Sequence, residues 1–400
     1  MSLAQSVRLT LVTDAEQPAV RLAFAGAALA ATLVLPLAGC TNAASEPSPD
    51  TQTASAQAPS PSETETPTTT PSRSQAPTRS TKPGAKLQVS EVLTGLTTPW
   101  GLVTLKDGTL LISERDTRKI LHVDGSKETL VRTIDQANPS GEAGLLGLLA
   151  SKDERTILAF YTASNDNRIA SMSWDGQRLG EPKVILSGLP KGSRHFGGRM
   201  VLGPDGYVYV GAGEGGNPSL AQDKGSLGGK ILRITLSGKP APGNPFGDEI
   251  YSYGHRNIEG LAFDNKGRLW ASEFGENDWD ELNLITKGGN YGWPLVEGSG
   301  SGKGLINPKI VWRPADASPS GLAYWQGELW MAGLRGIRLW EIPLDGTSTD
   351  KPIAHFTGTY GRLRTVMPSH DGSSLLLTSS NTDGRGRTLP GDDKLYRITR

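Results

Sequence analysis

The sequence predicts an all-β fold, a six-bladed β-propeller, and three observations support that prediction. First, the chain of 400 residues contains 50 glycines and 27 prolines, which is typical of a protein rich in turns. Second, from Leu87 onward, short apolar runs alternate with turn residues, and a unit of two such runs recurs about six times. Third, the runs of a unit are joined by Asp-Gly or a similar pair, which accepts the positive φ angles of a tight hairpin turn. Such units cannot bury both faces of a sheet alone, so a ring of them is expected.

The chain is expected to begin with a lipoprotein signal peptide, residues 1–39. An arginine at position 21 precedes an almost unbroken apolar run that ends in Leu-Ala-Gly directly before Cys40. This ending resembles the bacterial lipobox, as in actinobacterial-type lipoproteins, in which the cysteine is lipidated and becomes the mature N-terminus. The alternative is a retained membrane-spanning helix, which the shortness of the run and Pro36 disfavour. The prediction places the protein on the extracytoplasmic face of the cell membrane, anchored through Cys40.

Residues 40–86 are expected to form a disordered tether. They consist mainly of Ser, Thr, Pro, Ala, Gln and Glu, with almost no large apolar side chain. Such a segment cannot bury enough surface to offset the entropy lost on ordering. The folded domain is therefore predicted to span residues 87–400.

The repeated units within that domain predict the blades. Inner hairpins are expected at residues 100–114, 144–161, 198–211, 260–273, 321–332 and 364–378. Outer strands are expected at residues 119–123, 230–234, 338–342 and 394–398. Residues 87–92 are expected to pair with the last blade and close the ring. Ligands of a propeller bind over its central channel, so functional residues are sought in the loops at one end of the blades.

Composition excludes several functional classes. The 41 basic and 41 acidic side chains cancel, so nothing indicates a nucleic-acid partner. The single cysteine excludes an intramolecular disulfide and leaves a thiolate metal site without partner ligands.

One stretch of about a hundred residues gathers the groups of a redox site. It contains a histidine before two glycines, His195, and an arginine-asparagine pair, Arg256 and Asn257, followed by an acidic loop. Imidazole is the side chain whose unperturbed pKa lies near neutral pH, and the glycines leave room for ligands. The alternatives are a turn histidine packed on Phe196, arginines that are ordinary surface charges, and a solvated acidic loop.

Six sequence boxes resemble the soluble pyrroloquinoline-quinone-dependent glucose/sorbosone dehydrogenases, especially the aldose sugar dehydrogenase branch. They occur in unbroken order within residues 87–400: His195–Arg199, Gly254–Asn257, Asp280–Asn283, Gly289–Trp293, Gly333–Gly336 and Gly361–Arg364. The resemblance implies that the C1 hydroxyl of an aldose is oxidised to a lactone by hydride transfer to the quinone. It names neither the sugar nor the electron acceptor, and a monomer or homodimer is expected.

The resemblance also implies roles around the catalytic base. His195 matches the histidine that takes the hydroxyl proton. Glu214 falls where the family has an acidic residue that orients the base, usually Asp. Glu142 occupies the place of a glutamine near the base, so it is expected to contribute to the cofactor and substrate site and to alter its charge.

Arginines are implied as cofactor ligands. Arg256 and Asn257 match the pair that contacts the quinone carbonyls, where a guanidinium would stabilise charge growing on oxygen. Arg362 and Arg364 match arginines that hold cofactor carboxylates, and their spacing places both on one face of a strand. Arg335 sits where some members have lysine.

Calcium is the second implied cofactor. Gly275 and Glu276 match carbonyl donors to the ion that bridges the quinone, although the family often has Pro in place of Glu276. Asp280 and Glu281, with the carbonyl of Tyr291, match a second, structural site. Such oxygen donors from irregular loops are the ligands that calcium prefers.

Two other functions remain open from the sequence. Six-bladed propellers also include calcium-dependent lactonases, which would need a carboxylate-asparagine metal cage at the channel centre and no surrounding arginines. A non-catalytic propeller that binds partners at the cell surface is the other alternative. The short loops between the boxes favour a dehydrogenase with an open site and a broad preference among aldoses.

Overall fold

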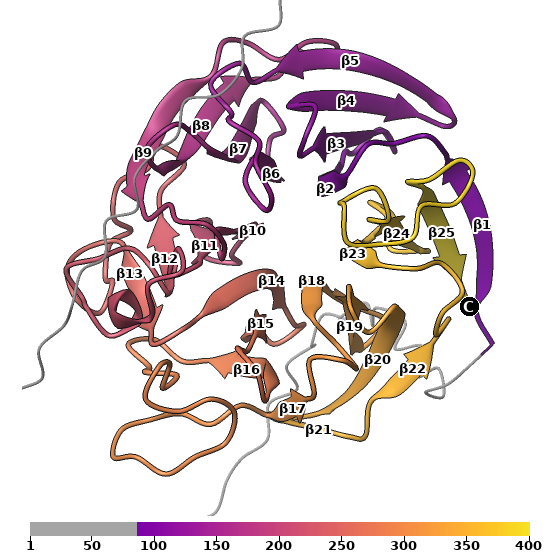
Figure 1. Ribbon diagram of the computed structural model, residues 1–400. Helices are drawn as coiled ribbons and strands as arrows, with labels where there is room; N and C mark the ends of the chain where they lie inside the picture. The colour runs from indigo at the N-terminus through magenta and orange to yellow at the C-terminus, as the bar shows by residue number, and fades with distance from the viewer. Residues whose placement is uncertain (1–85) are drawn as a thin grey trace, which may run out of the picture. The chain divides into compact units, whose positions relative to one another are not determined.

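The structure, a computed structural model, describes residues 86–400 (Figure 1). The predicted signal peptide, the lipidation site at Cys40 and almost all of the tether lie outside these residues. Among the described residues no helix is long and apolar enough to cross a membrane.

Six antiparallel sheets form a ring around a central channel, as Figure 1 shows, so the predicted six-bladed propeller is confirmed. Each blade runs from an inner strand at the channel to an outer strand at the rim. The first two blades are β2 (Pro99–Thr104), β3 (Leu110–Glu114), β4 (Lys119–Asp124) and β5 (Lys127–Thr133), then β6 (Leu145–Ala150), β7 (Thr156–Thr162), β8 (Asn167–Ser173) and β9 (Lys183–Leu189). The next two are β10 (Gly197–Leu202), β11 (Val208–Ala212), β12 (Lys230–Ile234) and β13 (Ile250–Tyr253), then β14 (Asn257–Phe263), β15 (Leu269–Phe274), β16 (Asp280–Ile285) and β17 (Ile310–Trp312).

The fifth and sixth blades complete the ring. The fifth consists of β18 (Pro319–Trp325), β19 (Glu328–Gly333) and β20 (Arg338–Asp345), with β21 (Ser348–Thr349) and β22 (Ile353–His355) both paired to β20. The sixth consists of β23 (Leu363–Pro368), β24 (Leu375–Ser379), β25 (Leu395–Thr399) and the N-terminal β1 (Gln88–Leu93). Because β1 pairs with β25 in antiparallel register, with Val89 opposite Ile398, the predicted closure is confirmed. A short 3-10 turn, Pro218–Ala221, lies between β11 and β12.

Apolar side chains on the faces of adjacent blades hold the ring together. Trp270 and Trp330, for example, are fully buried, and each lies in a cluster of aliphatic and aromatic side chains. Removing a side chain of this size leaves a cavity and costs about 3–5 kcal/mol of unfolding free energy. The loops at the end of the blades are thus held on a rigid frame.

Each of the six inner strands contains a register shift near its first residues, in its pairing with the second strand of the same blade. A bulge of this kind re-aims side chains locally. Glycine is required at such positions by close packing: a Cβ on Gly147 would lie 2.0 Å from the carbonyl oxygen of Gly198 on the next blade. The bulges therefore bring neighbouring backbones together at the channel and turn Arg199, Glu259 and Arg364 into the ring's centre.

Candidate active site

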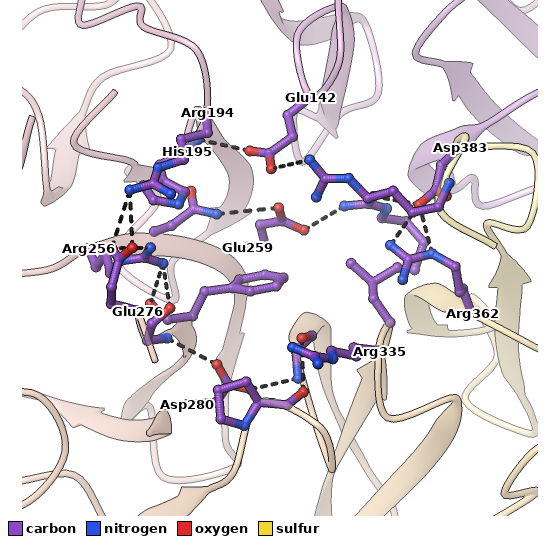
Figure 2. A pocket seen from close by; sticks show the side chains of 18 of the residues that line it. Glu142, Arg194, His195, Arg256, Glu259, Glu276, Asp280, Arg335, Arg362 and Asp383 are labelled. Atoms are coloured by element: carbon purple, nitrogen blue, oxygen red, sulfur yellow. Dashed lines mark hydrogen bonds and ion pairs between the residues drawn. The ribbon is translucent and has the colours of Figure 1, made fainter. Parts of the chain in front are cut away.

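A cavity of about 590 Å³ lies over the channel, and loops of five blades together with the loop before β6 supply its walls (Figure 2). The structure brings most of the residues predicted from the sequence together here: Glu142, His195, Arg256, Asn257, Gly275, Glu276, Asp280, Arg335, Arg362 and Arg364. Glu214 lies directly behind His195, whereas Glu281 and Tyr291 do not line the cavity.

His195 is fixed at the cavity wall by two carboxylates. Its backbone N–H donates to Oε2 of Glu142 at 2.8 Å, and its Nδ1 lies 2.8 Å and 3.1 Å from the two carboxylate oxygens of Glu214. The residue adopts a left-handed conformation, φ 61°, just before β10. Within residues 86–400 no hydrogen bond involves its Nε2, which leaves that nitrogen as the ring atom available to a ligand.

Glu214 is completely buried and belongs to a tight turn that packs against His195. Its Oε2 also accepts the backbone N–H of Gly216 at 2.7 Å, and the N–H of Gly215 donates to the carbonyl of His195 at 3.0 Å. A Cβ at Gly213 would lie 2.0 Å from that same carbonyl, so glycine is needed for this approach. The turn therefore fixes the orientation of the imidazole.

Glu142 reaches the same wall from the loop before β6. Its second oxygen forms an ion pair with Arg385 at 3.0 Å. Burial alone would raise the pKa of Glu142, but the N–H of His195 and the guanidinium of Arg385 outweigh it and hold the pKa below its ordinary value. Glu142 is therefore an anion. Figure 2 shows its carboxylate beside His195.

Arg256 lies beside Glu276 on the same wall of the cavity, as Figure 2 shows. Its Nη2 lies 2.5 Å from Oε2 of Glu276, and its Nη1 donates to the carbonyl of Gly275 at 2.5 Å. Arg194 binds the same carboxylate at 3.1 Å. Burial opposes ionisation of Glu276, but Arg256 more than offsets it, so the pKa of Glu276 lies below its usual range. Asn257 is held separately, since its Oδ1 accepts the N–H of Gly197 at 2.9 Å.

The opposite wall is built from arginines that acidic residues hold in place. Arg362 binds Asp383 at 2.8 Å, and Arg364 binds Glu259 at 2.6 Å and lies 3.8 Å from Asp383. Arg362 and Arg364 therefore point to one face, as predicted. The cause is not strand alternation, because Arg362 lies before β23 and Arg364 lies within its register shift. Burial lowers the pKa of Arg364, although Glu259 opposes the effect, and its Nε has no hydrogen-bond partner in the described chain.

Positive charge exceeds negative charge around the cavity. Seven arginines line it, against five carboxylates. Arg335 is exposed at the rim and, within the described part of the chain, has no ion pair or hydrogen bond from its side chain. A site with this balance attracts an anion that carries more than one carboxylate.

The predicted calcium ligands divide between two places. Asp280 faces the cavity, where it accepts the N–H groups of Gly275 at 3.0 Å and Ser318 at 2.6 Å. Glu281, the next residue of β16, points away and accepts the N–H of Gly298 at 2.8 Å, because successive side chains alternate across a strand. A single site that uses both side chains is therefore not assembled here, and the ligand roles of Gly275, Glu276 and Tyr291 remain predictions.

Two acidic residues of this region, Asp280 and Glu281, have raised pKa values. Burial raises the pKa of Asp280 to about 6. Burial and the Glu273 carboxylate raise the pKa of Glu281 to about 8. The Oδ1 atom of Asn283, whose amide group binds Glu281, is buried without a partner among the described residues. No group of three or more His, Cys, Asp or Glu side chains in residues 86–400 is arranged to hold a metal.

Five charged residues of the cavity wall were not predicted from the sequence: Arg115, Arg194, Glu259, Asp383 and Arg385. Two of them carried a signal. Arg194 directly precedes His195, and Glu259 lies two residues after Asn257 on the same strand. Asp383 and Arg385 lie in a Gly-Arg-rich loop without a recognisable pattern, and only the ring closure brings this loop to the site.

The Glucose / Sorbosone dehydrogenase family model matches residues 96–390, most of the described domain. The chain belongs to this family. Its fold matches the PQQ-bound form of the aldose sugar dehydrogenase from Streptomyces coelicolor, with a TM-score of 0.76 and 50% identity over 79% of this chain and 99% of that one. It is also 28% identical to the aldose sugar dehydrogenase YliI of Escherichia coli (strain K12) over 71% of this chain and 88% of that protein. Quinoprotein glucose dehydrogenase B of Acinetobacter calcoaceticus is 33% identical over about half of each chain, 52%.

Because the chain belongs to the glucose/sorbosone dehydrogenase family, it is an oxidoreductase of the sugar dehydrogenase type. Within the family's fold, the arginine-rich cavity and the His195–Glu214 pair occupy the mouth of the channel.

Proposed function

We propose that this protein oxidises the C1 hydroxyl of aldose sugars to lactones, using pyrroloquinoline quinone as the oxidant. The observation that carries the proposal is a buried His195–Glu214 pair that faces a cavity with an excess of arginine. The Streptomyces coelicolor relative, 50% identical, was described with this quinone bound. When bound, the quinone supplies a two-electron acceptor for the hydride of C1.

His195 is the general base of the proposed reaction. An ionised Glu214 accepts a hydrogen bond from Nδ1–H, so the lone pair of the neutral ring lies on Nε2. Nε2 can then take the proton of the C1 hydroxyl. Glu214 keeps the ring in this tautomer and stabilises the imidazolium that forms.

The arginines fit a planar ligand with several carboxylates. Arg362 and Arg364 already point to one face, and Arg335 stands free at the rim. Each guanidinium offers a fork of donors that matches a carboxylate. Arg256, together with Asn257, would contact the quinone oxygens, where its charge favours the reduced form.

Calcium is proposed as a second cofactor. The carbonyl of Gly275, which now accepts from Arg256, and that of Glu276 would serve an ion beside the quinone. A second ion would use Glu281 and the carbonyl of Tyr291 without Asp280, because Asp280 points to the opposite face of β16. The donor chemistry fits, because carboxylate and carbonyl oxygens are the ligands of calcium.

The lactonase alternative required a metal cage of carboxylate and asparagine at the channel centre. The central carboxylate, Glu259, instead forms a buried ion pair with Arg364, and Asn257 is committed to the N–H of Gly197. Both contacts favour the dehydrogenase.

The cellular setting is proposed from the sequence alone. A lipid anchor on Cys40 would hold the enzyme, as a monomer or homodimer, on the extracytoplasmic face of the membrane. Replacing Cys40 by Ser should move the protein from the membrane fraction to the soluble fraction. Continued membrane retention of the variant would point to an uncleaved apolar anchor.

A reconstitution tests the proposed chemistry. Residues 87–400 are expressed, loaded with pyrroloquinoline quinone with and without calcium, and assayed with a dye acceptor across a panel of aldoses. Dye reduction that requires both additions is the expected result. No quinone absorbance on the protein after desalting, with no dye reduction, would refute the proposal and favour a propeller that only binds partners.

A further inference from the structure

A second hollow opens beside the active-site cavity, between the fifth and sixth blades. This side groove has a volume of about 410 Å³ and shares four wall residues with the central cavity: Leu334, Arg335, Arg362 and Arg385. Its other walls are the β19–β20 turn, the β22–β23 connection and the β24–β25 loop, which Figure 1 draws in orange and yellow near the channel mouth. Whatever binds in the groove therefore lies next to the ligands of the central site.

Glycines allow this groove to form. A Cβ at Gly386 would lie 2.8 Å from Cδ of Arg362, so only glycine lets the β24–β25 loop rest on that arginine. Gly361 has a φ of 72°, and a Cβ there would lie 2.2 Å from Oδ1 of Asn381. The same Oδ1 accepts the N–H of Arg362 at 2.8 Å, which fixes the loop against the strand.

The chemistry of the groove differs from that of the central cavity. None of the described residues that line it carries a carboxylate, whereas five carboxylates line the central cavity. Its walls instead combine the apolar side chains of Ile337 and Leu389 with cationic Arg335, Arg385 and Arg387. Leu389 is 42% exposed. Sugars are commonly bound through carboxylates and amides that accept from hydroxyl groups. The groove has no carboxylate, and the Oδ1 of its amide residue, Asn381, already accepts the N–H of Arg362, so this lining disfavours a sugar.

One of these arginines is not committed elsewhere. Within residues 86–400, Arg387 makes no side-chain hydrogen bond or ion pair, and it is exposed. Arg335 also lacks such a partner there but is proposed above as a cofactor ligand, and Arg385 is paired with Glu142. An apolar wall beside a free guanidinium group matches a planar aromatic molecule that carries a negative charge.

We propose that the side groove is the acceptor subsite, which binds a small anionic aromatic quinone as the oxidant of the reduced enzyme. This inference rests on the proposed dehydrogenase function. Oxidation of the sugar to a lactone releases two electrons and two protons. The acceptor quinone takes up both and leaves as a hydroquinone, so the overall reaction is aldose plus quinone to lactone plus hydroquinone. The shared wall gives the acceptor access to the site without displacing the sugar.

The test uses the reconstituted full chain with 1,2-naphthoquinone-4-sulfonate as acceptor and uncharged 1,2-naphthoquinone as its neutral counterpart. Arg387→Glu reverses one charge of the groove and lies outside the proposed cofactor ligands. Arg178→Glu, an equally exposed arginine between β8 and β9, is the matched control. Arg387→Lys tests rescue by charge alone.

Arg387→Glu is expected to raise the acceptor KM for the sulfonate about tenfold at low salt, which corresponds to about 1.4 kcal/mol. The effect should shrink as ionic strength increases. The KM for the neutral quinone, the KM for glucose and kcat should stay within about twofold, and Arg178→Glu should resemble the unmodified chain. Arg387→Lys should recover most of the loss.

Equal sulfonate KM values for the unmodified chain and Arg387→Glu would overturn the proposal. A rise in the glucose KM instead would overturn it too, since the groove would then serve the sugar. If the chain takes up no pyrroloquinoline quinone, which desalting and absorbance reveal, the proposed function itself fails. Calorimetric titration of the unloaded chain with the sulfonate then tests separately whether the groove binds the acceptor. Weaker sulfonate binding by Arg387→Glu than by Arg178→Glu supports the proposed subsite, and equal binding refutes it.

Discussion

Replacing Glu214 by Gln tests the role of the carboxylate behind the base. Two donors face its oxygens: Nδ1–H of His195 and the backbone N–H of Gly216. Glutamine has only one side-chain oxygen. Because the backbone N–H of Gly216 cannot turn away, this oxygen is expected to face Gly216. The amide NH2 group then faces Nδ1, which must become an acceptor. The proton moves to Nε2, and His195 can no longer accept the hydroxyl proton there.

The expected loss in kcat is about 10³- to 10⁴-fold, or ~4–5.5 kcal/mol of barrier. The size follows from the tautomer, since the same fault in the histidine-aspartate pair of a serine protease lowers kcat by about 10⁴. Glu341→Gln is the matched control, because it alters a buried glutamate bound to His355 far from the cavity. Quinone affinity, followed by absorbance, and melting temperature should separate the catalytic effect from misfolding.

The two variants are expected to differ in turnover. Both should lose stability, and only Glu214→Gln should lose nearly all turnover while it still binds the quinone. If Glu214→Gln keeps more than about a tenth of kcat with normal quinone affinity, Glu214 does not set the tautomer, and the base assignment of His195 loses its main support.

Three further outcomes follow from the cavity. Arg364→Ala should weaken quinone affinity at least ~10-fold in an absorbance titration, because it leaves the Glu259 carboxylate buried without its cation. Unchanged affinity would refute the role of Arg364 as a quinone ligand. Glu276→Gln should strengthen calcium-free quinone binding severalfold, since it releases Arg256 for the ligand; equal or weaker binding would contradict this. In the metal-free protein the raised pKa of Asp280 means that the folded state holds this proton more tightly, so the contribution of Asp280 to the free energy of unfolding falls as pH rises from about 4 to about 6. Asp280→Asn should remove up to ~3 kcal/mol of that fall, which denaturant titrations across this pH range measure.

Local patterns predicted the fold because each blade is a local structure. Asp-Gly pairs and alternating apolar runs specify hairpins within about fifteen residues, and all six predicted inner hairpins are present. The closing strand was also predictable, since β1 carries an apolar run that precedes any complete blade. A ring of repeated hairpins needs little information beyond this local pattern.

The partners of the site residues were not predictable in the same way. Arg364 and Glu259 are 105 residues apart, and Arg194 and Glu276 are 82 apart, so only the ring closure brings them together. No period or spacing in the sequence encodes such a pair. The strand alternation at Asp280 and Glu281 was available from the sequence, but a family resemblance that grouped the two residues concealed it.

The acidic residues of the cavity explain how so many arginines can share one wall. Without counterions, Arg362, Arg364 and Arg385 would repel one another and turn toward solvent. Asp383, Glu259 and Glu142 hold them extended, and each acid uses only part of the donor fork. Arg362 and Arg364 line the cavity with side chains only 12% and 6% exposed, so much of the desolvation and ordering of their remaining donors is already completed by the fold. The surplus of two positive charges is then available to an anionic ligand. Truncation of Asp383 or Glu259 would release the arginine that each one holds, so it should weaken binding almost as much as the loss of that arginine.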